Sequence, residues 1–392
     1  MKVLSKIKML FAATAIASVM MPTAVIADNG ETPGIGSMVI MSGLKNPWDM
    51  AFTKDGSMFF TEKCDGLSVK TASGVTKLYG MKGSKGYGAT GNDLFCEGQA
   101  GMLGVTLDPK FASNRTLYLY STSNKYHGDG CKTNFEKCDG NIVMKFKVAK
   151  DLSKVSGRTD IVKDIQYKPF KSNQPFGGPG AHNGGRMVFG PDGYLYVGTG
   201  DRHRGICGQD NSILCSVVLR IDGNGKGHPK NKVKGDKRIY TYGHRNVQGI
   251  AVRPSDGAIF TAEHGPWHND EITKLVSGGN GGWDPAEKRA GRKACPDKYC
   301  GYEPNQMEGM TPAVRAAYTP MSDTRFKDLM PPAWQNNGYS QGTGSAAFLK
   351  GKEWGNYEGR LATGIMGIGF GGTPGGMRID ITDLAADGLS VR

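Results

Sequence analysis

The chain has 392 residues and a formal charge of +13, and 59 of its residues are glycine, about twice the usual glycine share of roughly 7%. With 38% hydrophobic and 22% charged residues, the composition excludes a disordered chain, a membrane bundle, a collagen-like repeat and a coiled coil. We therefore expect one large domain in which glycine marks tight turns between short strands.

Residues 1–27 differ in character from the rest of the chain. Three lysines precede an apolar run that begins at Met9 and ends at Ala27. This order is typical of a secretory signal peptide, whereas a membrane anchor needs a longer uninterrupted apolar run. We expect cleavage here, a single mature domain over residues 28–392 without a transmembrane span, and a location in the periplasm or outside the cell.

The excess of basic residues raises the question of an acidic partner. Removal of the leader lowers the charge of +13 by its three lysines. Export argues against a nucleic acid as the partner, and the sequence has no arginine-rich run or recognition helix. We interpret the charge as a solvated basic surface that can attract acidic ligands or an anionic envelope.

Five hairpins are predicted, each made of two apolar runs around a turn. They cover residues 50–61, 103–119, 187–197, 250–261 and 346–362. Asp-Gly between two such runs is a strong hairpin signal because glycine accepts a positive φ. The recurring hairpins predict an all-β domain and favour the inner strands of propeller blades, with a β-sandwich as the alternative.

The eight cysteines are an even number, which predicts disulfides in an exported chain. Pairing of neighbours in the sequence suggests Cys64–Cys96, Cys131–Cys138, Cys207–Cys215 and Cys295–Cys300. Other connectivities are possible. A zinc site is disfavoured because the sequence has no Cys-x-x-Cys motif.

Four polar, glycine-containing motifs precede or follow the hairpins. They are Glu97–Gly104, His182–Arg186 with Gly200–Arg202, Tyr242–Gly249, and Glu263–Pro266 with Asp270–Ile272 and Gly278–Trp283.

His182 and Asp201 lie at opposite ends of one predicted hairpin, so they can meet at the same rim of the domain. A carboxylate bonded to one imidazole nitrogen fixes the tautomer and leaves the other nitrogen as a base. A histidine bonded to a loop carbonyl is the alternative.

Two further motifs offer binding groups. Arg245 and Asn246 combine a fixed cation and an amide, which suit an anionic or quinone oxygen; a salt bridge between blades is the alternative. The turn at Gly265 and Pro266 exposes carbonyl oxygens of the kind that bind Ca²⁺. Its alternative is a tight turn without a ligand.

Taken in order, these motifs resemble one family, the soluble pyrroloquinoline quinone (PQQ)-dependent glucose/sorbosone (aldose sugar) dehydrogenases. The resemblance extends from about Leu44 to about Arg378. It implies a six-bladed β-propeller with PQQ over the mouth of the central channel. It also implies oxidation of aldoses at the anomeric carbon to lactones, with electrons passed to an external acceptor.

The resemblance assigns roles to individual residues. His182 is similar to the general base that takes the proton of the sugar C1 hydroxyl, Asp201 would orient it, and Gln99 would touch the substrate. Arg245 would stabilise the charge that develops on the quinone. The residues that would bind PQQ are Arg245, Asn246 and His264.

The resemblance also implies calcium. Gly265 and Pro266 would supply carbonyls to a Ca²⁺ that binds PQQ and acts as a Lewis acid, and Asp270 matches an acidic position near a structural Ca²⁺. Two features depart from the family pattern. Met366 stands where the family has a lysine that pairs with a PQQ carboxylate, and the family's last arginine-containing segment and hairpin do not occur before Arg392. We therefore expect the last blade to be incomplete.

Two other functions stay open. A Ca²⁺-dependent propeller lactonase would need several carboxylates around a central metal. A non-catalytic exported propeller that binds carbohydrate or a partner is favoured by the missing lysine and the missing last segment.

Overall fold

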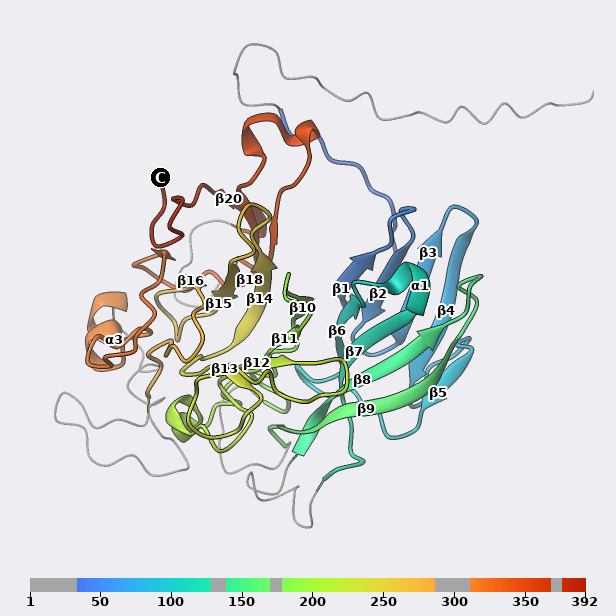
Figure 1. Ribbon diagram of the computed structural model, residues 1–392, viewed down its shortest axis with the longest axis horizontal. Helices are drawn as coiled ribbons and strands as arrows, with labels where there is room; N and C mark the ends of the chain where they lie inside the picture. The colour runs from blue at the N-terminus through green and yellow to red at the C-terminus, as the bar shows by residue number, and fades with distance from the viewer. Residues whose placement is uncertain (1–33, 128–138, 170–177, 286–310, 368–375) are drawn as a thin grey trace, which may run out of the picture.

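The computed structural model describes residues 34–127, 139–169, 178–285, 311–367 and 376–392. In these residues the chain forms five sheets that follow one another in chain order (Figure 1). All strand pairs are antiparallel except β4 with β5. The architecture is an all-β propeller, as predicted. The predicted signal peptide and the cysteines at 131, 138, 295 and 300 lie outside the described residues.

We call the sheets blades 1 to 5. Blade 1 contains β1 (Pro47–Phe52), β2 (Met58–Glu62), β3 (Gly66–Thr71), β4 (Gly74–Met81) and β5 (Ala89–Gly91), and blade 2 contains β6 (Met102–Leu107), β7 (Thr116–Thr122), β8 (Asp139–Val148) and β9 (Val155–Gln166). Blade 3 contains β10 (Met187–Phe189), β11 (Leu195–Gly198), β12 (Val218–Ile221) and β13 (Ile239–Thr241). Blade 4 contains β14 (Val247–Val252), β15 (Ile259–Glu263), β16 (Glu271–Lys274) and β17 (Trp334–Gln335).

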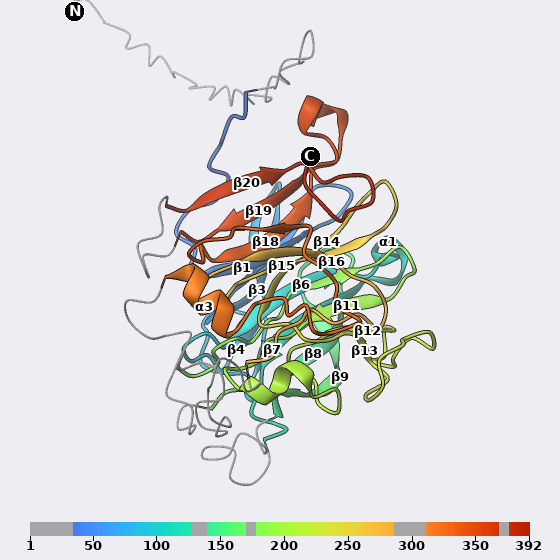
Figure 2. The same ribbon diagram turned by 90° about the vertical axis from the view of Figure 1, so that its left-hand side faces the viewer.

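Blade 5 contains β18 (Thr343–Phe348), β19 (Leu361–Ile365) and β20 (Arg378–Thr382), which lie side by side at one edge of the molecule (Figure 2). The described helices are short: α1 (Phe111–Asn114), α3 (Pro312–Tyr318), and the 3₁₀ helices η2 (Gly205–Gln209) and η3 (Lys352–Tyr357). The described residues form five blades rather than the six expected, and a sixth blade stays a prediction.

All five predicted hairpins are confirmed, and each forms the first two strands of a blade. Three of the turns share one device: an aspartate side chain accepts the backbone N–H two residues further on. The aspartates are Asp55, Asp192 and Asp256. The glycine that follows each of them has a positive φ, which an L-residue adopts only with strain. Local chemistry therefore sets the hairpin turn between the first two strands of these three blades.

The first strands of neighbouring blades pack against one another in the series β1, β6, β10, β14 and β18. Glycines allow the backbones to touch at two of these contacts. A Cβ added to Gly104 would lie 2.1 Å from the carbonyl oxygen of Gly185, and one added to Gly249 would lie 2.4 Å from that of Gly344. The inner strands can converge only because these positions have no side chain.

One largely buried ion pair joins four blades. Arg186 Nη1 binds Asp49 Oδ1, and the other Asp49 oxygen accepts the Val105 N–H at 3.0 Å. The Arg186 Nε donates to the carbonyl oxygen of Gln248 at 3.0 Å, and its guanidinium lies 4.4 Å from the ring centroid of Trp48. We call this contact set the hub. Burial raises the pKa of Asp49, and the Arg186 charge opposes that rise.

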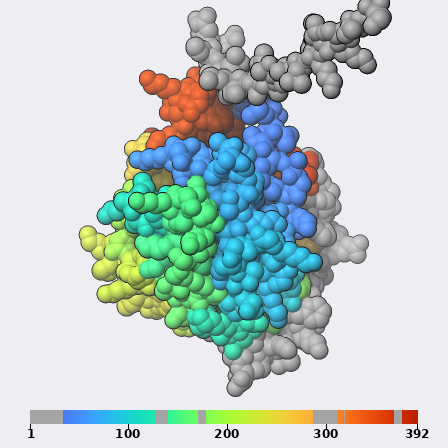
Figure 3. Space-filling model, turned by 90° about the vertical axis from the view of Figure 1, so that its right-hand side faces the viewer, coloured from blue at the N-terminus to red at the C-terminus, as the bar shows by residue number. Residues whose placement is uncertain are grey.

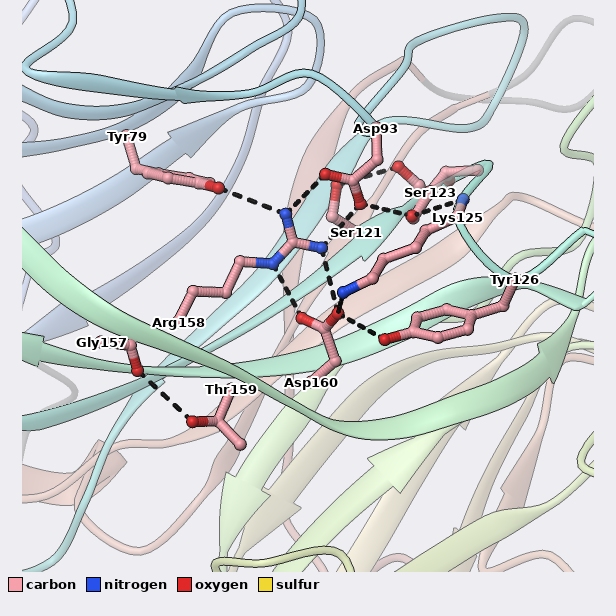
Figure 4. A network of polar contacts seen from close by, with 11 residues as sticks. Tyr79, Asp93, Ser121, Ser123, Lys125, Tyr126, Gly157, Arg158, Thr159 and Asp160 are labelled. Atoms are coloured by element: carbon pink, nitrogen blue, oxygen red, sulfur yellow. Dashed lines mark hydrogen bonds and ion pairs between the residues drawn. The ribbon is translucent and has the colours of Figure 1, made fainter.

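A second polar network joins blades 1 and 2 near the surface (Figure 4). Arg158 binds both oxygens of Asp93, each at 2.6 Å, and also pairs with Asp160. Tyr126 and Lys125 donate to the same Asp160. The two blades present one continuous outer face, blue against green in Figure 3. Bidentate Arg–carboxylate geometry makes this the kind of network that contributes to stability.

Two of the four predicted disulfides, Cys64–Cys96 and Cys207–Cys215, are formed. The first joins the end of β2 to the loop before β6, and the second joins η2 to the loop before β12. No helix in the described ranges combines the length and the apolar character that a membrane crossing requires.

Replacing Arg186 with methionine is expected to lower the free energy of unfolding by about 3–5 kcal/mol, because Asp49 is left buried without its counter-charge. Urea unfolding measures this change. The control is Arg392→Met, which breaks a pair with Asp383 in which the arginine side chain is 67% exposed; its expected effect is below about 1 kcal/mol. Equal losses in both variants would contradict a special role for the hub.

Candidate functional site

A cavity of about 1070 Å³ opens where the first strands of the blades begin, and all five blades contribute to its wall. In four blades the register between the first two strands shifts at this end. At least one residue inside each shift lines the cavity, namely Trp48, Leu103, Gln248 and Ser345. Bulges re-aim side chains and often lie beside functional sites. Here they turn the ends of the inner strands into a binding wall.

His182 and Asp201 meet at this wall, as the hairpin geometry predicts. His182 Nδ1 lies 2.5 Å from Asp201 Oδ1. His182 lines the cavity, whereas Asp201 is fully buried behind it. Burial lowers the pKa of His182 well below its usual value of 6.5, and the nearby positive charge of Arg245 lowers it further. The imidazole is therefore neutral at pH 7.

Asp201 is held by two further N–H donors. Trp283 Nε1 donates to Oδ2 at 2.7 Å, and the backbone N–H of His203 donates to Oδ1 at 2.9 Å. Burial raises the pKa of this carboxyl, and the Arg245 charge opposes the rise. Hydrogen bonds from three nitrogens favour the ionised carboxylate. Asp201 thus accepts the Nδ1–H of His182, which leaves Nε2 as the hydrogen-bond acceptor of the imidazole.

Arg245 and Asn246 are positioned by Glu263, at the end of β15. One carboxylate oxygen of Glu263 accepts the backbone N–H groups of both residues. The other lies 3.0 Å from His244 Nδ1. Arg245 Nη1 then donates to the carbonyl oxygen of His264 at 3.1 Å. The three residues predicted to bind a cofactor, Arg245, Asn246 and His264, all line the cavity.

Gln99 also lines the cavity, and its Oε1 accepts the backbone N–H of His182 at 3.1 Å. This bond places the Gln99 amide beside the His182–Asp201 pair, which we call the dyad.

The turn after β15 places Gly265 at the cavity, with Asp270 buried behind it. Both oxygens of Asp270 accept hydrogen bonds: from Gly265 N, Ser340 Oγ, Gln341 N, and Thr343 N and Oγ1. The Gly265 carbonyl accepts the Trp267 N–H at 3.1 Å. In the described residues no three His, Cys, Asp or Glu side chains group as a metal site. Asp270 here fastens the turn to the start of β18.

The cavity wall is positively charged. Lys63, Arg186, Arg245 and Arg378 line it, and its described lining contains no aspartate or glutamate. Met366 lies on the wall at the position where the resemblance implies a lysine. Arg378 starts β20 on the same wall, paired in register with Ile365, the residue before Met366. A cation is therefore present beside Met366.

Sequence reasoning missed two residues of the site, His203 and Trp283. His203 Nε2 lies 2.8 Å from His182 Nε2. Trp283 ends the glycine-rich run 278–283, but 82 positions separate it from Asp201. For His203 the local signal was the polar run from Arg202 to Arg204 directly after Asp201, and for Trp283 it was the glycine-rich motif that this residue ends.

Comparison with known proteins identifies the sequence relatives. A family model described as glucose/sorbosone dehydrogenase matches residues 44–368. An aldose sugar dehydrogenase of Escherichia coli is 32% identical over 62% of this chain and 60% of its own length. A quinoprotein glucose dehydrogenase B of Acinetobacter calcoaceticus is 27% identical over 62% of this chain and 51% of its own length. The matches thus span less than two thirds of these relatives.

Solved structures share the fold. The apo form of the E. coli soluble aldose sugar dehydrogenase superposes with a TM-score of 0.64 at 23% identity, covering 89% of this chain and 85% of that one. The PQQ-bound aldose sugar dehydrogenase of Streptomyces coelicolor gives 0.58 at 22% identity, covering 90% and 86%.

Gly200→Ala tests how tightly the dyad is held. The new Cβ would lie 2.1 Å from the His182 carbonyl oxygen and 2.8 Å from Asn246 Oδ1, so both residues must shift. We expect a loss of about 1–3 kcal/mol in the free energy of unfolding, as for other overpacked sites. In the control Gly88→Ala the nearest atom lies at 3.6 Å, and stability should hold. An unchanged unfolding curve for Gly200→Ala would contradict this packing.

Proposed function

The chain belongs to the glucose/sorbosone dehydrogenase family, and we propose that it is a PQQ-dependent dehydrogenase that oxidises aldose sugars at the anomeric carbon to lactones. One observation carries the proposal: a neutral histidine backed by a buried carboxylate opens into a cationic cavity. The family membership supports an oxidoreductase. The substrate, the cofactor and the residue roles are our inference.

PQQ fits this cavity by its chemistry. It is a flat quinone with three carboxylates, and the described wall offers four cationic side chains and no acidic one. Arg245, Asn246 and His264 would hold it; Arg378, a further cation on this wall, is already paired with Asp380. Trp48 and Trp267 add aromatic surface to the same wall. When bound, PQQ supplies the acceptor for the hydride that leaves the sugar C1.

The residues of the dyad then supply the proton chemistry. Neutral His182 takes the proton of the C1 hydroxyl at Nε2, so that the C1–O bond can become the lactone carbonyl as the C1 hydrogen leaves. Asp201 fixes the Nδ1–H tautomer and stabilises the imidazolium that forms. Gln99 is hydrogen-bonded to the His182 backbone and would touch the substrate. The Arg245 guanidinium provides fixed positive charge beside the reacting groups.

Calcium does not enter this mechanism. Asp270 uses both carboxylate oxygens for hydrogen bonds, and the Gly265 carbonyl already accepts one. The roles of Gly265, Pro266 and Asp270 as calcium ligands therefore stay predictions of the resemblance, and no step is assigned to a cation here.

The same lining bears on the lactonase alternative, which needs several carboxylates around a central metal. The described wall carries none.

We also propose export to the periplasm or outside the cell, consistent with the two disulfides, and an external electron acceptor.

His182→Ala is expected to lower the rate of dye reduction about 10²–10⁴-fold with aldoses, because the general base is lost, while PQQ binding persists. Absorbance titration with PQQ and a dye-coupled assay over a panel of aldoses measure the two properties. The control is His228→Ala, a loop histidine that does not line the cavity, which should retain full activity. Absence of both PQQ binding and dye reduction in the parent protein would overturn the proposed function.

The pH profile provides an independent test. A base acts only when neutral, and the pKa of His182 is lowered below 6.5 by burial. Activity should therefore stay level as the pH falls from 8 through 6.5, and decline only at lower pH. The profile is measured as kcat/KM, obtained from initial rates at each pH in buffers of constant ionic strength. An acid limb centred above pH 6.5 would contradict a desolvated base.

A further inference from the structure

We propose that Trp283 is a positioning residue of the dyad: its indole N–H holds the Asp201 carboxylate in the orientation that accepts the Nδ1–H of His182, and so keeps His182 in the tautomer that can act as a base. This inference rests on the proposed role of His182. It adds a fully buried residue that does not line the cavity and acts on the reaction through Asp201.

The hydrogen bonds to Asp201 described above divide between its two oxygens. His182 Nδ1 and the backbone N–H of His203 bind Oδ1, at 2.5 and 2.9 Å. The indole N–H of Trp283 binds Oδ2 at 2.7 Å, a length typical of a hydrogen bond to a charged acceptor. Donors on one oxygen alone would let the carboxylate turn about its Cβ–Cγ bond, whereas a donor on the second oxygen fixes its plane. Trp283 therefore supplies a bond that sets the direction in which Asp201 faces the base.

The protonation state of Asp201 decides which nitrogen of His182 carries the hydrogen. An ionised carboxylate only accepts, so Nδ1 donates to it and Nε2 keeps a lone pair. A protonated carboxyl can donate to Nδ1 instead, which places the hydrogen of the neutral imidazole on Nε2 and removes the base. Burial raises the pKa of Asp201, and the Arg245 charge and the Trp283 hydrogen bond are among the contacts that oppose this rise. The indole N–H thus favours the state in which His182 can accept a proton.

The backbone of Trp283 is fastened on both sides. Its N–H donates to the carbonyl oxygen of Gly243 at 2.9 Å, and its own carbonyl oxygen accepts Gln209 Nε2 at 3.0 Å. The side chains of Gln209 and the buried Asn280 also exchange two hydrogen bonds, at 3.0 and 3.2 Å. A Cβ on Gly208 would lie 2.2 Å from the Trp283 carbonyl oxygen, so the chain packs closely here. These contacts hold the indole N–H in place for the carboxylate.

The same tryptophan meets the segment that carries Arg245. Gly243, which accepts the backbone N–H of Trp283, stands two residues before Arg245. The Arg245 guanidinium lies 5.8 Å from the centroid of the Trp283 ring, near the outer limit at which a cation is attracted to an aromatic ring. The contact with Asp201 needs the indole N–H, whereas the contact with Arg245 needs only an aromatic ring. A substitution that keeps a ring and removes the N–H therefore tests the first contact alone.

The kinetic test compares two substitutions in the full PQQ-loaded enzyme. Trp283→Phe keeps an aromatic ring and removes the N–H, so kcat for an aldose should fall about 10–100-fold as the base loses its alignment. KM should stay within about twofold, because no residue of the cavity wall is changed. The matched control is Trp334→Phe, which removes an indole from the hydrophobic cluster of blades 4 and 5 and should leave both constants unchanged. An unchanged kcat in Trp283→Phe, or a raised KM with kcat retained, would overturn the proposal.

A second measurement needs neither turnover nor PQQ, so it separates failure of this inference from failure of the proposed function. Nitrogen-15 NMR of the histidine rings should show the hydrogen of His182 on Nδ1 in the parent protein, and should show the tautomer with hydrogen on Nε2 becoming populated in Trp283→Phe. Replacing Trp283 with benzothienylalanine, which has the shape of tryptophan and sulfur in place of the N–H, should give the same change with the packing preserved. The parent tautomer in both variants would overturn the proposal, whatever their activity.

Discussion

The fold depends on how the first strands of the blades are held together at the channel, and the hub is the contact that does this. Arg186 extends from blade 3 to the Asp49 carboxylate of blade 1 and to a carbonyl of blade 4, and Asp49 bonds in turn to blade 2. A buried carboxylate is unfavourable unless it is paired and hydrogen-bonded. The contacts that keep the Asp49 charge paired therefore also fix the positions of four blades relative to one another.

The site is built on that placement. The strand ends that surround the hub are the ones whose register shifts open the cavity. Gly200 lets the strand end before Asp201 pass against the His182 backbone, and Glu263 and Asp270 fix the neighbouring segments from behind. These two acidic groups thus act from behind the cavity, and the charged side chains on its described wall are all basic.

The parts of this arrangement that could be predicted from sequence are those set by local chemistry. An aspartate that accepts an N–H two residues on, followed by glycine, forms its turn within a few residues, so the hairpins and the meeting of His182 with Asp201 were predictable. The contacts of Asp201 with Trp283 and of Asp49 with Arg186 span 82 and 137 positions, and no periodicity encodes them. His203 has a left-handed backbone conformation, which is usually predicted from a glycine, and no glycine stands at this position.

The separation of the hub partners also bears on how the protein reaches and leaves its folded state. Each hairpin closes a short loop, whereas the hub needs chain from Asp49 to Gln248 to be in place, and contacts that span long loops are slow to form. A contact made after the folding barrier stabilises the native state against unfolding without speeding folding. A hub formed after that barrier would govern the lifetime of the folded molecule more than the rate at which it is made.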